Sequence, residues 1–407
     1  MIDQKLAEKI RNYVLSDINE EVFRAAADPF WQKLKNTGTT LWLDTGDMQE
    51  AEEVWTSDME ALTTNNTLIN KVIQKGIYDD YIKESAAIVS ALPLSERVKE
   101  IAFILNARHG LRLVKRFGGY VSVELHTDTA NDIDAILHYG LRYQAICPEK
   151  FIIKVPYTAS GLIGARLLKE RGVRINFTLG FGARQNVIAA HIARPDYLNV
   201  FLGRIGAYIA DNKLGDGSGA GEKAVIETQR AISRIAGSYS HSTRLIAASL
   251  RSYSQLESLA GTDLYTMPPK VAMDGRKILE GKFSNKTEHD YTPGVSVDLV
   301  DSGIYKFWSV DPGLEKLAME LGADLPASGA ELEDRFRDAG FYDAFPLMTT
   351  ENIRHITDDG KIPVYSRWED MIRNKKIAPD TLLNIAGLYS FTSDQGELDR
   401  RIENMIS

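Results

Sequence analysis

The chain has 407 residues, one cysteine and a formal net charge of −8 at pH 7. Because Cys147 stands alone, no intramolecular disulfide can form, which is typical of proteins from a reducing compartment. The acidic balance argues against a nucleic-acid partner, and no apolar stretch reaches the roughly 18 residues that a membrane span needs.

Residues 1–38 are expected to form an N-terminal helical segment. Apolar residues recur at the three- and four-residue spacing of a helix over residues 4–36, at Leu6, Ile10, Val14, Val22 and Phe23. The segment lacks the uninterrupted apolar run of a signal peptide. The sequence therefore indicates a cytoplasmic protein without a membrane partner, and self-association into a homo-oligomer stays open.

From Thr39 onward, short apolar runs alternate with longer helical patterns, for example at 160–172, 183–193 and 221–236. This alternation predicts parallel strands joined by helices, and eight such strands close a (β/α)₈ barrel. An open doubly wound sheet is the rival, but no G-x-G-x-x-G turn follows the first run. The eight expected strands are TTLWLD (39–44), EALTTN (60–65), YVSVEL (120–125), FIIKVP (151–156), RINFTLGF (174–181), YLNVFLGRI (197–205), RLIAASLR (244–251) and LYTMPP (264–269).

The alternation stops beyond Pro269. Residues 270–407 are predicted to form helices joined by polar loops, with a terminal amphipathic helix at 397–406. The expected organisation is the N-terminal segment, a barrel over residues 39–284 and a helical C-terminal extension over residues 285–407.

Polar side chains occur near the carboxyl ends of the first seven predicted strands, where the active site of this fold lies. Each residue alone has an ordinary explanation, such as a helix cap or a surface ion pair. Their joint occurrence predicts one site, formed by Asp44, Thr64, Asn65, Glu124, Lys154, Asn176, Thr178, Arg204, Ser249 and Arg251.

Lys154 interrupts the apolar run FIIKVP. Burial disfavours a charged ammonium, and a desolvated neutral amine is the usual group that forms a Schiff base with a carbonyl. The alternative is a structural lysine that extends to the strand end or pairs with Glu124. We interpret Lys154 as a nucleophile.

Arg204 and Arg251 are interpreted as an anion clamp, since guanidinium binds phosphate in bidentate fashion and barrels often bind phosphate after their late strands. Together with the lysine, they point to aldol chemistry on a phosphorylated carbonyl compound. The seven histidines are scattered without metal-ligand spacing, so we expect no metal and no organic cofactor.

The chain resembles the transaldolase family in segments that follow the family's order and cover most of residues 39–280 and the last helix. The segments are LWLDTGD (41–47), LTTNNTLI (62–69), VSVEL (121–125), IIKVPYTASGLIGARLLKERGVRINFTLGF (152–181), VFLGRI (200–205), AASLRS (247–252), LAGTDLYTMPP (259–269) and SFTSDQGELDRRIENMI (390–406). The resemblance implies transfer of a dihydroxyacetone unit between sugar phosphates through a lysine Schiff base, as in pentose phosphate metabolism.

The resemblance also implies roles for single residues. Lys154 matches the Schiff-base lysine, and Asp44 matches the acid/base that handles the proton of the substrate's C4 hydroxyl. Glu124 and Thr178 match the pair that holds a catalytic water. Asn65 and Asn176 match residues that bind the hydroxyls of the dihydroxyacetone unit. The phosphate site is matched by Arg204, Ser249 and Arg251.

Two alternatives remain. Related fructose-6-phosphate aldolases carry Tyr at the position of Phe201 and lack the glutamate, so Phe201 with Glu124 favours transfer over simple cleavage. Two positions also depart from the family pattern: Asn199 stands where the family usually has a substrate-contacting Ser, and Asn66 stands where it usually has a Pro.

The second alternative is a non-catalytic sugar-phosphate-binding or assembly protein. It would use residues 285–385, which match no family segment, as its interaction surface.

Overall fold

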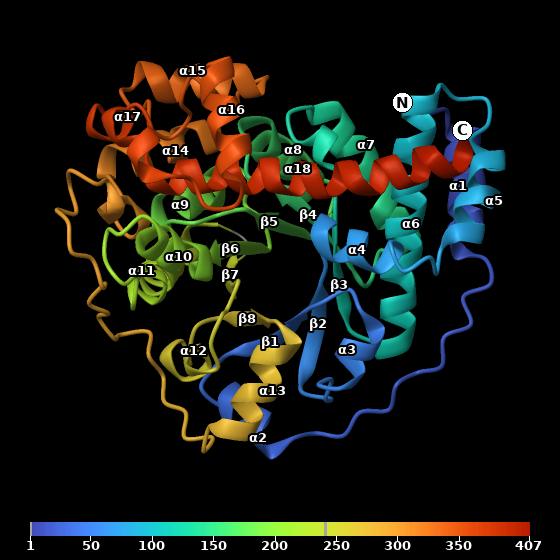
Figure 1. Ribbon diagram of the computed structural model, residues 1–407, viewed down its shortest axis with the longest axis horizontal. Coiled ribbons are helices and arrows are strands. Elements are labelled where there is room, and N and C mark those ends of the chain that lie inside the picture. Colours follow the sequence, from blue (N-terminus) through green and yellow to red (C-terminus); the bar gives the residue numbers. More distant parts are fainter. Residues whose placement is uncertain (1, 240–241) are drawn as a thin grey trace.

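The predicted barrel is present: eight parallel strands pair in chain order, and the last pairs with the first (Figure 1). The computed structural model describes residues 2–239 and 242–407, so Met1, Ser240 and His241, which fall in the expected N-terminal segment and barrel, lie outside the described residues. The strands are β1 (Thr40–Asp44), β2 (Met59–Thr63), β3 (Tyr120–Glu124), β4 (Phe151–Pro156), β5 (Ile175–Thr178), β6 (Tyr197–Phe201), β7 (Arg244–Ala248) and β8 (Leu264–Met267).

Each predicted run coincides with one strand to within a few residues, and most strand residues are buried. Every residue of β4 and β5 is buried, which explains why the runs read as nearly continuous apolar stretches. In the register of the sheet, Lys154 is paired with Glu124 on one side and with Asn176 on the other. These three polar residues therefore lie at one level of the barrel.

The barrel helices begin and end close to the predicted patterns. Three helices, rather than one, separate β2 from β3, and the longest of them ends at Gly118, whose left-handed φ of 70° suits a glycine cap. The bounds are α3 (Met48–Glu52), α4 (Asn66–Ile73), α5 (Asp79–Ile88), α6 (Leu94–Phe117), η1 (Thr127–Thr129), α7 (Ile133–Ile146), α8 (Ala159–Glu170), α9 (Ala183–Ile192), α10 (Leu202–Asp211), α11 (Ala220–Ile235), η2 (Ala236–Ser238), α12 (Ser254–Ser258) and α13 (Pro269–Ile278).

The N-terminal prediction is wrong in part. Helices α1 (Gln4–Leu15) and α2 (Pro29–Lys35) are present, but residues 16–28 between them are not helical. Val22 is 67% exposed, so the apolar spacing does not continue through this stretch. The backbone N–H of Phe23 donates to the carbonyl of Arg116 on α6 at 2.7 Å.

Arginines one turn apart on α6 explain this course of the chain. Arg108 donates to the carbonyls of Val14 and Asp17, both at 2.9 Å, and Arg112 pairs with Glu20 at 2.5 Å. Arg108 thereby satisfies one carbonyl in the last turn of α1 and one just beyond it, and Arg112 holds the following chain by an ion pair. Tertiary contacts therefore override the local helical pattern.

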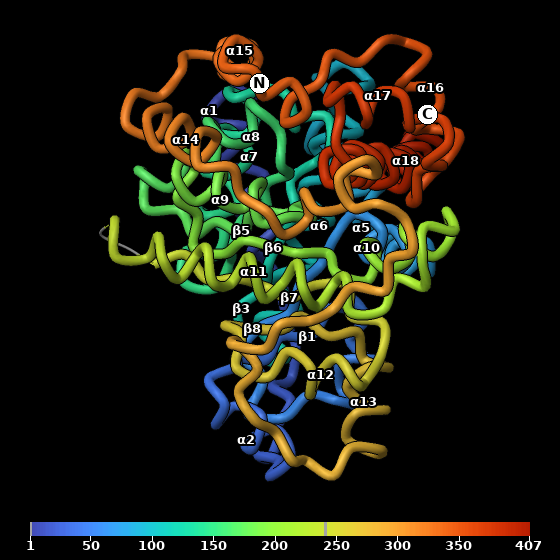
Figure 2. Tube along the Cα trace, turned by 90° about the vertical axis from the view of Figure 1, so that its left-hand side faces the viewer, coloured from blue at the N-terminus to red at the C-terminus, as the bar shows by residue number. Residues whose placement is uncertain are grey.

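The C-terminal extension is helical after an irregular stretch, and its last helix is much longer than predicted. Its elements are η3 (Ile304–Phe307), α14 (Pro312–Ala323), α15 (Gly329–Asp338), α16 (Thr350–Asp359), η4 (Tyr365–Arg367), α17 (Glu369–Arg373) and α18 (Pro379–Ile406). Helix α18 has 28 residues and contacts α4, α5 and α6 (Figure 1). Helices α14–α18 lie at one end of the molecule and α2 at the other (Figure 2). None of the described helices is long and apolar enough to cross a membrane.

A buried ionic cluster fixes this extension to the barrel. Arg184 on α9 donates two hydrogen bonds of 2.7 Å to Asp380 on α18 and lies 3.0 Å from the carboxylate of Asp343. Burial acts to raise the pKa of Asp343, but Arg184 and Lys306 outweigh it and hold that pKa below its usual range. Removing one member of such a buried set costs on the order of 3–5 kcal/mol, so the cluster holds α18 firmly in place.

Candidate active site

A pocket of about 720 Å³, including the part that opens to solvent, lies at the carboxyl ends of the strands. Most of the predicted site residues line it: Asp44, Asn65, Lys154, Asn199, Phe201, Arg204, Ser249 and Arg251. Glu124, Asn176 and Thr178 do not line this pocket and are at most 4% exposed. Glu124 and Asn176 are the register neighbours of Lys154, so the structure brings them to the same place.

Lys154 is the buried centre of the site. Its Nζ donates to the carbonyl of Thr64 at 3.1 Å and lies 3.4 Å from Oε2 of Glu124, and both charged side chains are 4% exposed. The pairing with Glu124 that the structural alternative predicted is thus present. Burial raises the pKa of Glu124 against the opposing attraction of Lys154, so this carboxylate is disposed to accept a proton.

Asp44, the last residue of β1, also lines the pocket. Its Oδ1 accepts a hydrogen bond from Thr63 at 2.9 Å, and the Thr63 hydroxyl is 2.5 Å from that of Thr266. Burial raises the pKa of Asp44, while Lys154, Thr63 and Arg251 act in the opposite direction. A carboxyl group whose pKa is raised in this way is better able to take up and return a proton.

A chain of side-chain hydrogen bonds crosses the barrel interior below the pocket. Asn199 donates to Oδ1 of Asn176 at 2.6 Å and to the carbonyl of Phe177 at 2.9 Å, and Asn176 donates to Ser122 at 3.0 Å. Asn199 lines the pocket, whereas the amide nitrogen and oxygen of Asn176 are each already hydrogen-bonded to protein. The buried Thr178 hydroxyl has no hydrogen-bond partner among the described residues, which fits a group that holds a water.

The cationic part of the pocket differs in detail from the prediction. Strand β6 ends at Phe201, so Arg204 lies in the first turn of α10, while Ser249 and Arg251 follow β7. A Cβ on residue 203 would collide with the Ser249 carbonyl and the Arg251 side chain, so Gly203 permits this close approach. Ser249 itself has a left-handed φ of 64°.

The two arginines are close enough to repel each other. Burial, and then the charge of Arg251, lower the pKa of Arg204 to about 10. Nη1 of Arg204 is buried without a hydrogen-bond partner in the described part of the chain. No side chain among the described residues caps the N-terminus of α10, and Arg204 lies in its first turn, so an anion bound here would meet both a charge and a helix end.

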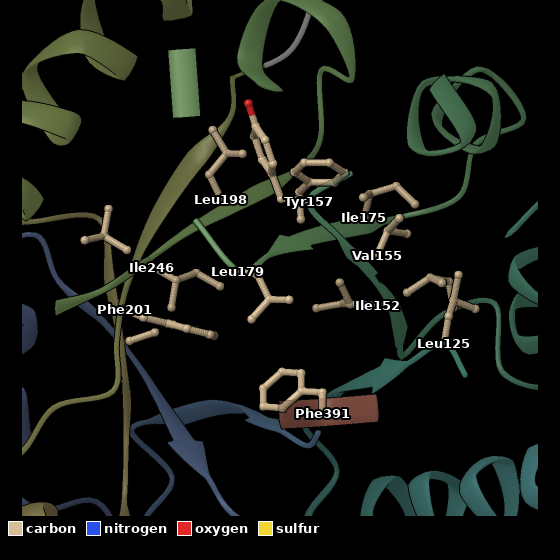
Figure 3. Close-up of a cluster of buried hydrophobic side chains, with 14 of the residues drawn as sticks. Leu125, Ile152, Val155, Tyr157, Ile175, Leu179, Leu198, Phe201, Ile246 and Phe391 are labelled. Carbon is tan, nitrogen blue, oxygen red and sulfur yellow. The ribbon is translucent and has the colours of Figure 1, made fainter. Parts of the chain in front are cut away.

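Two residues of the extension complete the pocket, and our sequence prediction did not include them: Lys361 and Phe391. The Phe391 ring on α18 lies 5.8 Å from Nζ of Lys154 and 5.8 Å from the guanidinium of Arg204. Figure 3 shows it in one apolar cluster with the barrel side chain Leu179. Phe391 falls within the C-terminal segment that resembles the family, so that resemblance could have identified it. Lys361 lies where no family segment matches.

The loop after β1 is supported from behind by a buried histidine. Nε2 of His109 is 2.6 Å from the carbonyl of Gly46, and Nδ1 is 2.9 Å from the hydroxyl of Tyr78. Gly46 is two residues from Asp44, so this contact fixes the segment that follows the carboxylate. Burial lowers the pKa of His109 to about 4.

The low pKa of His109 predicts a pH-dependent stability. An unfolded chain restores the ordinary histidine pKa of 6.5, so between about pH 6.5 and pH 4 the unfolded state binds the additional proton. The contribution of His109 is complete above pH 6.5 and is lost as the pH falls, by up to about 3 kcal/mol. Urea unfolding at several pH values checks this. The neutral variant His109→Gln should show a shallower decline, and equal slopes for both proteins would contradict the assignment.

Metal-binding geometry is absent from the part of the chain that the structure describes: no three histidine, cysteine, aspartate or glutamate side chains gather to hold an ion.

The family described as Transaldolase/Fructose-6-phosphate aldolase matches residues 41–307, which contain all predicted site residues but neither Lys361 nor Phe391. A transaldolase of Gloeobacter violaceus is 27% identical over 274 residues, 65% of this chain and 69% of that protein. A transaldolase of Acidobacterium capsulatum is 27% identical over 273 residues, 64% of this chain and 80% of that protein.

Proposed function

This chain belongs to the transaldolase/fructose-6-phosphate aldolase family, and from that membership we propose that it is a transaldolase. It moves a dihydroxyacetone unit from a ketose phosphate to an aldose phosphate, as in pentose phosphate metabolism, without a cofactor. The observation that carries the proposal is a buried lysine–carboxylate pair, Lys154 and Glu124 at 3.4 Å, beside a pocket that also contains a second carboxylate and two arginines.

The first step is carbonyl attack by Lys154. The lysine gives its proton to Glu124, whose raised pKa favours this transfer. The neutral amine attacks the C2 ketone, and the carbinolamine loses water to give the imine. Glu124 and a water held by Thr178 carry the protons of this dehydration. The buried setting favours the step because water does not compete for the lysine.

Carbon–carbon cleavage follows, with Asp44 as the base. Asp44 takes the proton of the C4 hydroxyl, the C3–C4 bond breaks and an aldose phosphate leaves. The electron pair of the broken bond is delocalised into the iminium, so a neutral enamine remains on Lys154. An incoming aldehyde then reverses these steps, with Asp44 returning the proton to the new hydroxyl.

Amide side chains position the retained three-carbon unit. The Asn65 oxygen caps α4 by accepting from the N–H of Leu68 at 2.9 Å, which leaves the Asn65 amide N–H groups for a substrate hydroxyl. Asn199 occupies the pocket wall, and Asn176 holds it in position from below. We therefore assign the direct hydroxyl contacts to Asn65 and Asn199, with Phe201 as the apolar wall beside them.

The phosphate is assigned to Arg204, Ser249 and Arg251. Alanine at Arg204 or at Arg251 should raise KM for phosphorylated substrates by about ten- to hundredfold, since a charge-assisted bond contributes roughly 1.5–3 kcal/mol. KM for unphosphorylated dihydroxyacetone should change little. Steady-state kinetics with both donors measures the difference, with Arg171→Ala, an exposed arginine at the end of α8, as control. Normal KM values for sugar phosphates in both variants would place the phosphate elsewhere.

Release of the three-carbon unit distinguishes transfer from the aldolase alternative. Incubation with fructose 6-phosphate alone should give at most one equivalent of glyceraldehyde 3-phosphate per active site, because the enamine waits for an acceptor. Adding erythrose 4-phosphate should start continuous turnover. Steady release of free dihydroxyacetone without acceptor would indicate an aldolase, and no reaction with any sugar phosphate would favour the non-catalytic binding protein.

A further inference from the structure

The rim of the pocket carries a third cation that the roles assigned above do not use. Lys361 lines the pocket together with Arg204 and Arg251. Among the described residues, no carboxylate forms an ion pair with any of these three side chains, although Asp394 lies near enough to act on Arg204. The pocket lining itself includes one carboxylate, Asp44, against these three cations and Lys154. Such an excess of positive charge is suited to an anionic ligand.

The side chain of Lys361 is exposed, but hydrogen bonds hold the backbone of the loop that carries it. The side chain of Asn212, the C-cap of α10, donates to the carbonyl of Pro363 at 2.9 Å and accepts from the N–H of Tyr365 at 2.7 Å. Pro363 is buried, and the N–H of Val364 donates to Asp359 at 2.9 Å. The helix that carries Arg204 in its first turn therefore also fixes the loop that carries Lys361.

Lys361 lies outside the part of the chain that matches the family. Arg204 and Arg251 lie within the part of the chain that matches the family, residues 41–307, whereas Lys361 belongs to the extension beyond it. The extension thus adds a positive charge to a pocket that is formed mainly by barrel residues.

We propose that Lys361 is a specificity-determining residue that binds the substrate's phosphate as the third cation beside Arg204 and Arg251; this inference rests on the proposed function. A phosphate monoester carries nearly two negative charges and three terminal oxygens near neutral pH. Two guanidinium forks and one ammonium match that charge and number of acceptors, and an ammonium on a flexible stem adapts to the remaining oxygen. The extension thereby strengthens selection for phosphorylated over unphosphorylated sugars.

The test compares Lys361→Met, Lys361→Arg and wild type with two donors, fructose 6-phosphate and dihydroxyacetone. Lys361→Met should raise KM for fructose 6-phosphate about tenfold with kcat nearly unchanged, and leave the kinetics with dihydroxyacetone unaltered. Lys361→Arg keeps the charge and should keep most of the preference. Lys376→Met, an exposed lysine of the same extension that does not line the pocket, is the matched control.

Binding of inorganic phosphate separates this inference from the proposed function. Calorimetric titration should show binding to wild type that is about tenfold weaker in Lys361→Met and less dependent on salt. Weaker phosphate binding without any turnover in wild type would overturn the proposed reaction and retain Lys361 as a phosphate ligand. Equal phosphate binding in Lys361→Met and wild type, or an equal loss with both donors, would overturn the role of Lys361.

Discussion

Replacing Lys154 with alanine is expected to abolish covalent capture of a ketose phosphate and to lower turnover on the order of 10⁴-fold or more. Borohydride reduces an imine to a stable secondary amine. Wild-type protein treated with fructose 6-phosphate and borohydride should therefore gain mass on the peptide that contains Lys154. The variant should gain none, because among the described residues only Lys154 forms an ion pair with Glu124, the carboxylate that accepts its proton, at 3.4 Å.

A second lysine near the same strand provides the control. Lys150 immediately precedes β4, donates to the carbonyl of Gly118 at 2.8 Å and is half-buried outside the pocket. Lys150→Ala should therefore form the adduct and turn over as wild type does. The thermal unfolding of Lys154→Ala should be measured as well, since the substitution leaves Glu124 without its partner. An adduct on another lysine, or retained activity in a folded Lys154→Ala protein, would refute the assignment of the nucleophile.

Asp44→Asn should separate imine formation from bond cleavage. The amide is nearly isosteric and can still accept the hydrogen bond from Thr63, so the pocket should keep its shape. The adduct should form with fructose 6-phosphate, but its cleavage should slow by about 10²- to 10⁴-fold because no base takes the C4 hydroxyl proton. Rapid-quench trapping measures adduct formation, and release of glyceraldehyde 3-phosphate measures cleavage.

The pH profile gives an independent check on Asp44. Its pKa is raised by burial, and only the ionised form can accept a proton. The cleavage rate in wild type should therefore rise with pH along a limb that lies above the usual aspartate range. Asp44→Asn should lose this limb. A variant that cleaves the adduct at the wild-type rate, or fails to form any adduct, would contradict a role confined to cleavage.

The fold could be predicted because each barrel strand is encoded by a short continuous run of apolar residues. Strands buried on both faces need apolar residues at nearly every position, and this requirement produced eight separate runs. Polar residues inside such runs are costly to bury, so Lys154, Asn176 and Thr178 were conspicuous for the same reason. Most of the predicted residues now line one pocket, and Glu124 and Asn176 are the register neighbours of Lys154.

Short-range patterns failed where a distant partner decided the conformation. Residues 16–28 carry helical spacing, yet the carbonyls of Asp17 and Glu21 are bonded to Arg108 and Arg116 of α6, about ninety residues away in the chain. Helix α18 was predicted over ten residues and has 28, since its first half is stabilised by the buried pair of Asp380 with Arg184. Neither the arginine contacts of α6 nor the Asp380–Arg184 pair produces a periodic pattern in the local sequence.

The sequence by itself determined the barrel, the buried lysine and the carboxylates around it, because burying these groups requires a recognisable pattern within each strand. Only the tertiary structure decided which residues cover the pocket. Phe391 and Lys361 reach it from positions more than a hundred residues beyond β7, held there by the Arg184 cluster and by Asn212. Residues that are distant in the sequence meet only in the folded chain. Their contacts therefore leave no local pattern from which the sequence could predict them.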